Sequence, residues 1–196
     1  MPTPNRDPQH LAKLRDFYAE SRRIPSNPRI GELIGTSKAS ARKLMERLEK
    51  HGYVERTPDD DAWIPGRRFF EHALADGTVR AGMPTEAREF SSTPFYFDEY
   101  LIREPSKTVL IPVRGDSMID AHIDDGDLAV VEQGKCAGVG DFVVAMVDGD
   151  FTLKELVLEK GQFALKPHNP AYPIIVPEGE LEIFGVMVGL VRRFQS

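Results

Sequence analysis

The chain has 196 residues, 41% of them hydrophobic and 29% charged, which is typical of a globular protein. No segment approaches the roughly 20 consecutive apolar residues that cross a membrane, and Met1–Asp7 lacks the apolar stretch of a signal peptide. The single cysteine, Cys136, excludes an internal disulfide, so we expect a cytoplasmic protein without a membrane partner.

The formal charge of −6 is distributed unevenly along the chain. Residues 1–68 contain 14 lysines and arginines against 10 aspartates and glutamates, whereas residues 69–196 contain 11 against 21. The first part is therefore a candidate for binding a polyanion, and the acidic remainder is not.

Helical patterns fill the first 52 residues. A start signal at Asp7-Pro8 precedes a helix predicted over 8–22, with apolar residues at helical spacing: Leu11, Leu14, Phe17 and Tyr18. Asn27-Pro28 repeats the start signal for a short second helix that ends at Gly35.

A third helix is predicted from a cap at Thr36 or Ser37 to His51, with Gly52 as its end. Its apolar residues share one side, and a largely charged set faces the other way: Ala39, Arg42, Lys43, Glu46 and Lys50. A helix, a short turn and a basic-faced helix are the order of a helix-turn-helix motif.

Two short strands, 53–57 and 62–64, are predicted around an aspartate turn at 59–61, as in the wing of a winged helix. Tyr53 and Trp63 would pack this wing, and the acidic tip disfavours a phosphate contact there. We therefore assign residues 1–66 to a winged helix-turn-helix domain. Residues 67–77 are interpreted as a linker that packs in part, through Phe69, Phe70 and Leu74.

The remaining residues, 78–196, are predicted to form a mostly-β domain, which makes the chain an α+β protein. Strands are expected over 109–113, 128–131, 142–147, 151–158, 163–165 and 183–191. Asp125-Gly126-Asp127 and Asp148-Gly149-Asp150 are interpreted as turns, because no EF-hand spacing follows them. The five histidines are scattered, so we expect neither a metal nor a cofactor.

Two residues suggest nucleophilic chemistry. Ser117 follows a glycine in Val113–Asp120, and Lys154 lies in an apolar alternating run. A serine hydroxyl needs a base, and a lysine is a base only when burial keeps it neutral. Spacing alone leaves a chance pairing open, since short motifs match freely.

The ordered segments around these residues resemble the Ser-Lys self-cleaving family that contains LexA, the lambda-type phage repressors and UmuD. The resemblance covers about 79–194 and is carried by Gly115–Met118, Ile123–Leu128, Gly140–Val144, Phe151–Lys154, Leu165–Ile174 and Phe184–Val186. It implies that Ser117 is the nucleophile, that Lys154 is the general base, and that the backbone near Met118 holds the oxyanion.

The same resemblance implies that the chain cuts itself between a small residue and a glycine. Thr78–Pro84 fits, which places the cut at Ala81-Gly82. Both residues leave the carbonyl open to attack, and Gly82 permits a sharp bend. A flexible linker dipeptide is the alternative interpretation.

Residues 9–65 resemble the DNA-binding domain of LexA more weakly. LexA proteins carry Asn and paired acidic residues in the base-reading stretch, whereas this chain has Ser37, Lys38, Ala39, Ser40, Arg42 and Lys43. We expect Arg42 and Lys43 at base edges, with Ser37, Lys38 and Ser40 near phosphates. The operator should therefore differ from the usual LexA operator.

The resemblance implies a dimeric repressor of the DNA-damage (SOS) response that binds operator double-stranded DNA. By the same resemblance, it would form a homodimer partly through the last strand, near 184–190, and a RecA filament on single-stranded DNA would stimulate its self-cleavage. Three alternatives remain open: a UmuD-like accessory protein of a translesion polymerase, a repressor that uses the peptidase fold only to dimerise, and a signal-peptidase relative that acts on other proteins.

Overall fold

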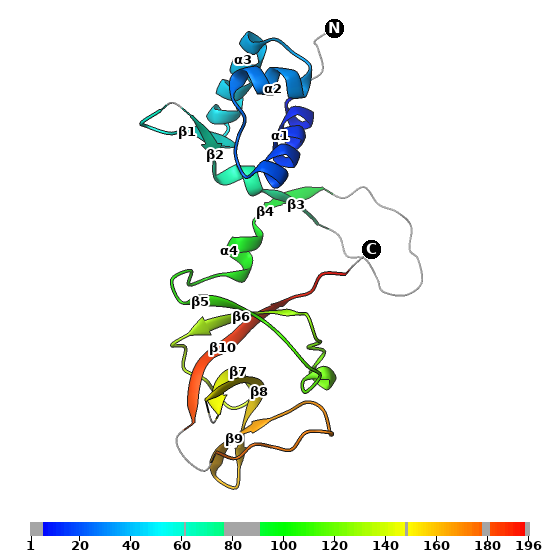
Figure 1. Cartoon of the computed structure of the whole chain (residues 1–196), viewed down its shortest axis with the longest axis vertical. Helices are drawn as coiled ribbons and strands as arrows, with labels where there is room; N and C mark the ends of the chain where they lie inside the picture. The colour runs from blue at the N-terminus through cyan, green and yellow to red at the C-terminus, as the bar shows by residue number, and fades with distance from the viewer. Residues whose placement is uncertain (1–5, 61, 77–90, 148, 178–180, 195–196) are drawn as a thin grey trace, which may run out of the picture. The chain divides into compact units, whose positions relative to one another are not determined.

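A computed structural model describes residues 6–60, 62–76, 91–147, 149–177 and 181–194. Its elements belong to two units, Met1–Tyr96 and Phe97–Ser196 (Figure 1). The first contains the helices predicted near the N-terminus, and the second contains most of the strands. No helix in the described ranges has the length and apolar composition that crossing a bilayer requires.

The first unit begins with α1 (Asp7–Ser21), α2 (Asn27–Ile34) and α3 (Lys38–Lys50). Gly35 ends α2 in the left-handed conformation, at φ +72°. Ser37 caps α3, because its side chain accepts a hydrogen bond from the backbone N–H of Ser40 at 3.2 Å. The apolar sides of the helices meet in one core: Leu11, Leu14, Ile30, Ala41, Leu44, Met45, Leu48, Val54, Trp63 and Phe69.

Asp7 and Asn27, predicted as start signals, are the first residues of their helices and do not cap them. The carboxylate of Asp7 accepts two hydrogen bonds of 2.7 Å from Arg47 in α3. The side-chain oxygen of Asn27 accepts one from Trp63 Nε1 at 3.1 Å. The side-chain oxygens of Asp7 and Asn27 therefore bond to residues distant in the sequence. Local capping would instead have used backbone N–H groups of their own helices.

The hairpin of β1 (Val54–Arg56) and β2 (Trp63–Pro65) follows α3. Next, a 3-10 turn, η1 (Arg67–Phe70), places Phe69 in the core with 1% exposure. Then β3 (His72–Ala75) pairs antiparallel with β4 (Ser92–Phe95), so the first unit continues to Tyr96. The residues predicted as a linker, 67–77, thus begin inside the packed part of this unit.

The second unit begins with a short helix, α4 (Phe97–Leu101), and contains an antiparallel sheet in the order β5-β6-β10-β7-β8-β9. The strands lie where the sequence predicted them: β5 (Thr108–Pro112), β6 (Leu128–Gln133), β7 (Phe142–Val147), β8 (Asp150–Glu159), β9 (Gln162–Lys166) and β10 (Glu182–Val191). At Gly185 a Cβ would lie 2.8 Å from Glu132 O, so only glycine lets β10 approach β6 this closely.

A buried ion pair holds the segment that precedes β6. Asp127 is 1% exposed and accepts hydrogen bonds from Arg192 Nε at 2.7 Å and Nη2 at 2.6 Å. Bonding to the Arg192 guanidinium lowers the pKa of the Asp127 carboxyl. Gly126 makes the predicted turn, at φ +86°. Asp127 was predicted only as a turn residue, but it also bonds to Arg192, directly after β10.

Replacing Phe69 by alanine should destabilise the first unit by about 3 kcal/mol, because it opens a cavity in the core. Its neighbour Phe70 is 50% exposed, so Phe70→Ala is the matched control and should cost less than about 1 kcal/mol. Trp63, the sole tryptophan, reports on this unit in urea unfolding followed by fluorescence. Equal losses for the two variants would contradict the burial of Phe69.

Candidate functional site

Ser117 lies in the loop between β5 and the 3-10 turn η2 (Ile119–Ala121). Gly115 adopts φ +86°, and its N–H donates to Asp125 Oδ1 at 2.8 Å. The carbonyl of Ser117 accepts the N–H of His168 at 2.8 Å. Met118 is 2% exposed, so its side chain is buried directly after the serine. The loop is therefore held from several directions with the Ser117 hydroxyl near β8.

Lys154 lies in β8 opposite Val143 of β7 and is 6% exposed. Its Nζ is 2.8 Å from Ser117 Oγ, 2.8 Å from Thr152 Oγ1 and 2.9 Å from the carbonyl oxygen of Leu153. Thr152 is two residues before Lys154, so both side chains leave the same face of the strand. The structure thus brings together the serine and the lysine that the sequence singled out.

Burial lowers the pKa of Lys154. The three oxygen atoms around Nζ are all uncharged groups, which compensate a buried ammonium less than a carboxylate would. A neutral amine can also engage all three: it donates two N–H bonds, to Thr152 and to Leu153, and its lone pair accepts the Ser117 hydroxyl proton. The geometry is therefore suited to activating the serine.

The backbone beside the serine offers donors for a developing negative charge. In the part of the chain that the structure describes, neither Ser117 nor Met118 donates a hydrogen bond from its backbone N–H. Two such amides on consecutive residues match the donors that stabilise an oxyanion in acyl transfer. The predicted placement at Met118 stays a prediction.

Ser117 and Lys154 line a cleft of about 290 Å³. Its other walls are mainly apolar. They come from the strands, through Ile111, Ala129, Val144 and Leu153, and from the loop that carries the serine, through Val113 and Met118. Such a cleft suits a short apolar stretch of chain. The predicted cut, Ala81-Gly82, lies outside the described residues.

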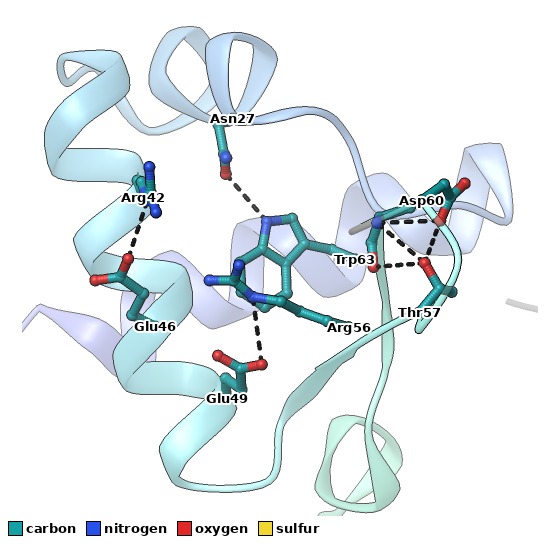
Figure 2. Close-up of polar contacts among 9 residues, drawn as sticks. Asn27, Arg42, Glu46, Glu49, Arg56, Thr57, Asp60 and Trp63 are labelled. Carbon is teal, nitrogen blue, oxygen red and sulfur yellow. Dashed lines mark hydrogen bonds and ion pairs between the residues drawn. The ribbon is translucent and has the colours of Figure 1, made fainter.

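A second surface lies on α3. The predicted DNA-contact residues are all exposed: Ser37, Lys38, Ala39, Ser40, Arg42 and Lys43. Figure 2 shows Arg42 beside Glu46 one turn along the helix, and the Arg42 Nε lies 3.0 Å from Glu46 Oε1. This leaves the terminal nitrogens of Arg42 pointing to solvent, while the Ser37 hydroxyl is occupied at the helix cap.

The hairpin β1–β2 is fixed to the helices through Trp63 (Figure 2). The guanidinium carbon of Arg56 lies 4.4 Å from the centre of the Trp63 ring, and its Nε lies 3.4 Å from Glu49 Oε1 of α3. At the tip, the N–H of Ala62 donates to Thr57 Oγ1 at 3.0 Å. The Arg56 side chain therefore links the hairpin to α3. Asp61 lies outside the described residues.

Thr152, Glu155 and His168 contribute to the serine and lysine site but were not predicted as site residues. Thr152 could have been found, because alternation along a strand puts it beside Lys154. Glu155 and His168 join segments that are distant in the sequence, and no local pattern shows that pairing.

Comparison with known proteins identifies the family. A Peptidase S24-like family model matches residues 73–188. LexA repressor 1 of Geobacter sulfurreducens is 37% identical over 202 residues, covering 97% of each chain. The LexA repressor of Alcanivorax borkumensis is 35% identical and covers 96% of this chain and 95% of its own. That of Opitutus terrae is 46% identical over 60% of each chain. The chain therefore belongs to the Peptidase S24-like family and, within it, to the LexA-like self-cleaving repressors.

The lowered pKa of Lys154 predicts how the free energy of unfolding changes with pH. Unfolded lysine titrates near 10.4, so between the folded and unfolded pKa values the unfolded chain binds more protons and stability rises with pH. In a Ser117→Ala background, Lys154→Met should therefore be stabilising at pH 7, and this gain should shrink towards pH 10. Urea unfolding at both pH values tests this, with exposed Lys107→Met as control. An identical gain at both pH values would contradict it.

Proposed function

We propose that the chain is a transcriptional repressor of the SOS response, which binds operator DNA as a dimer and inactivates itself by cutting its Ala81-Gly82 bond. The observation that carries the proposal is the 2.8 Å contact between the buried amine of Lys154 and the hydroxyl of Ser117. The family and the names of the relatives support the same activity.

In the proposed reaction, neutral Lys154 takes the Ser117 proton while Oγ attacks the Ala81 carbonyl carbon. The oxyanion forms beside the amides of Ser117 and Met118. The Lys154 ammonium then gives its proton to the departing Gly82 nitrogen, leaving Ala81 esterified to Ser117. Lys154 next takes a proton from a water molecule as the water oxygen attacks the Ala81 ester carbon. The Lys154 ammonium then returns this proton to Ser117 Oγ as the ester C–O bond breaks, which frees the Ala81 carboxyl end and restores both residues. Docking of the chain in the cleft excludes water and keeps the lysine neutral.

The first unit is proposed to be a winged helix-turn-helix DNA-binding domain. Its α2, the turn at Gly35 and the exposed α3 have the motif's order, and β1–β2 form the wing. Arg42 and Lys43 are assigned to base edges. Ser37, Lys38 and Ser40 are assigned to phosphates, with Ala39 in the same exposed turn. The N-terminus of α3 favours phosphate there, because its backbone N–H groups carry partial positive charge.

Self-cleavage then acts through the loss of paired binding. Two DNA-binding units joined through dimerised second units bind a two-fold operator far more tightly than one does. Dimerisation is assigned to the region of β10, and a RecA filament on single-stranded DNA is assigned the role of favouring the docked chain. The contacts of Lys154 favour a cleaving repressor over one that uses the fold only to dimerise.

Purified protein should cut itself faster at alkaline pH without any activator. Below the Lys154 pKa the rate should rise about tenfold per pH unit, because the neutral fraction rises by that factor. Mass spectrometry should find fragments that end at Ala81 and begin at Gly82. Ser117→Ala and Lys154→Ala should abolish both. A rate that stays flat between about pH 7 and pH 10 would argue against lysine as the base.

DNA binding should depend on the exposed side of α3. Arg42→Ala and Lys43→Ala should each weaken operator binding by about 1–3 kcal/mol, because each removes a contact to a base edge. Lys107→Ala removes an equal charge from the second unit and serves as control. Fluorescence anisotropy with specific and scrambled duplexes measures this. Equal weakening on both duplexes would assign these side chains to phosphates instead.

A further inference from the structure

His168 lies in the loop after β9, in a segment that carried the family resemblance but had no assigned role. Its backbone N–H donates to the Ser117 carbonyl at 2.8 Å, and its own carbonyl accepts the Asp120 N–H at 2.8 Å. One residue therefore bonds to the nucleophile loop on both sides of Met118. Asn169 adds a bond from Nδ2 to the Asp116 carbonyl at 3.1 Å.

The His168 side chain reaches the strand that carries the base. Its Nε2 lies 2.6 Å from Glu155 Oε2, and Glu155 directly follows Lys154 in β8. A carboxylate can only accept a hydrogen bond, so Nε2 carries the proton. The imidazole also packs edge-on against Phe142 of β7, with ring centres 5.6 Å apart, and Lys166 Nζ lies 3.5 Å from the same carboxylate oxygen. The ring is thus held by β7 and β8, and the carboxylate that it contacts is also held by Lys166 of β9.

We infer that His168 and Glu155 are positioning residues for self-cleavage. The backbone bonds of His168 hold Ser117, its side chain holds β8, and together they set the distance between Ser117 Oγ and Lys154 Nζ. The inference rests on the proposed function. Its physical reason is that a reaction between groups held in place is sensitive to geometry, and a displacement of about 1 Å can cost about 100-fold in rate.

The pair does not act on Lys154 directly. The imidazole contacts Glu155 and Phe142, whereas the neighbours of Nζ are Ser117, Thr152 and Leu153. Lys154 and Glu155 are consecutive in a strand, so their side chains leave opposite faces. Loss of the pair should therefore lower the rate and leave the shape of its pH dependence unchanged.

The test measures self-cleavage of the full chain between pH 7 and pH 10. His168→Ala should be slower by about 10- to 100-fold at every pH. His168→Gln should recover most of the rate, since its amide nitrogen can replace Nε2 as donor to Glu155. Glu155→Ala should be as slow as His168→Ala, and the double variant should be no slower than either, because one interaction is lost in all three. Glu159→Gln, in the same strand, is the control.

Each other outcome overturns the inference. A His168→Ala chain that cuts at the wild-type rate, or losses that multiply in the double variant, would show that the pair does not position the loop. A shifted pH dependence would show an action on Lys154 itself. Circular dichroism checks folding, and the glutamine variant keeps the test decisive if alanine unfolds the loop. A wild type that cuts at no pH, with or without activated RecA, would remove the proposed function and this inference together.

Discussion

The burial of one amine is the constraint on which the second unit depends. Lys154 is 6% exposed, and this burial disfavours its charge and lowers its pKa. The ammonium would cost stability, whereas the neutral amine, 2.8 Å from Ser117 Oγ, is the proposed base. The antiparallel sheet provides the burial, because β8 lies between β7 and β9, and the neighbouring side chain on the same face, Leu156, is 1% exposed. Stability and reactivity are thus set by the same packing.

The proposed nucleophile needs as much support as the proposed base, since a serine in a loop is positioned only by the contacts that hold the loop. The ion pair of Asp127 and Arg192 fixes the end of the segment between β5 and β6 to the end of β10. Gly115, with its positive φ, makes the turn before Ser117. His168 fixes the part that contains Ser117. These contacts come from strands that are distant in the sequence, so the site exists only when the sheet is complete. The first unit has its own core, and α3 contributes one side to this core and exposes the other, which agrees with the two proposed activities on one chain.

Much of this architecture followed from local patterns, and the failures have a common cause. The strands carry β-rich or alternating apolar residues, and Gly35 ended its helix as expected. Ser117 and Lys154 emerged because the order of motifs around them is specific. Asp7 and Asn27 were misjudged as caps because Arg47 and Trp63, far along the chain, take their oxygens. Asp127 has turn spacing, but its buried carboxylate pairs with Arg192, 65 residues away. Pairings of this kind depend on the tertiary fold and leave no periodic signal.

The most direct test of the central claim is the titration of Lys154 itself, followed by NMR of its side-chain Cε in the uncleavable Ser117→Ala chain. We expect an inflection clearly below the value near 10.4 of a free lysine, because the folded site disfavours the ammonium. An inflection at or above that value would mean that the amine stays charged where Ser117 needs a base, and the proposed chemistry would fail.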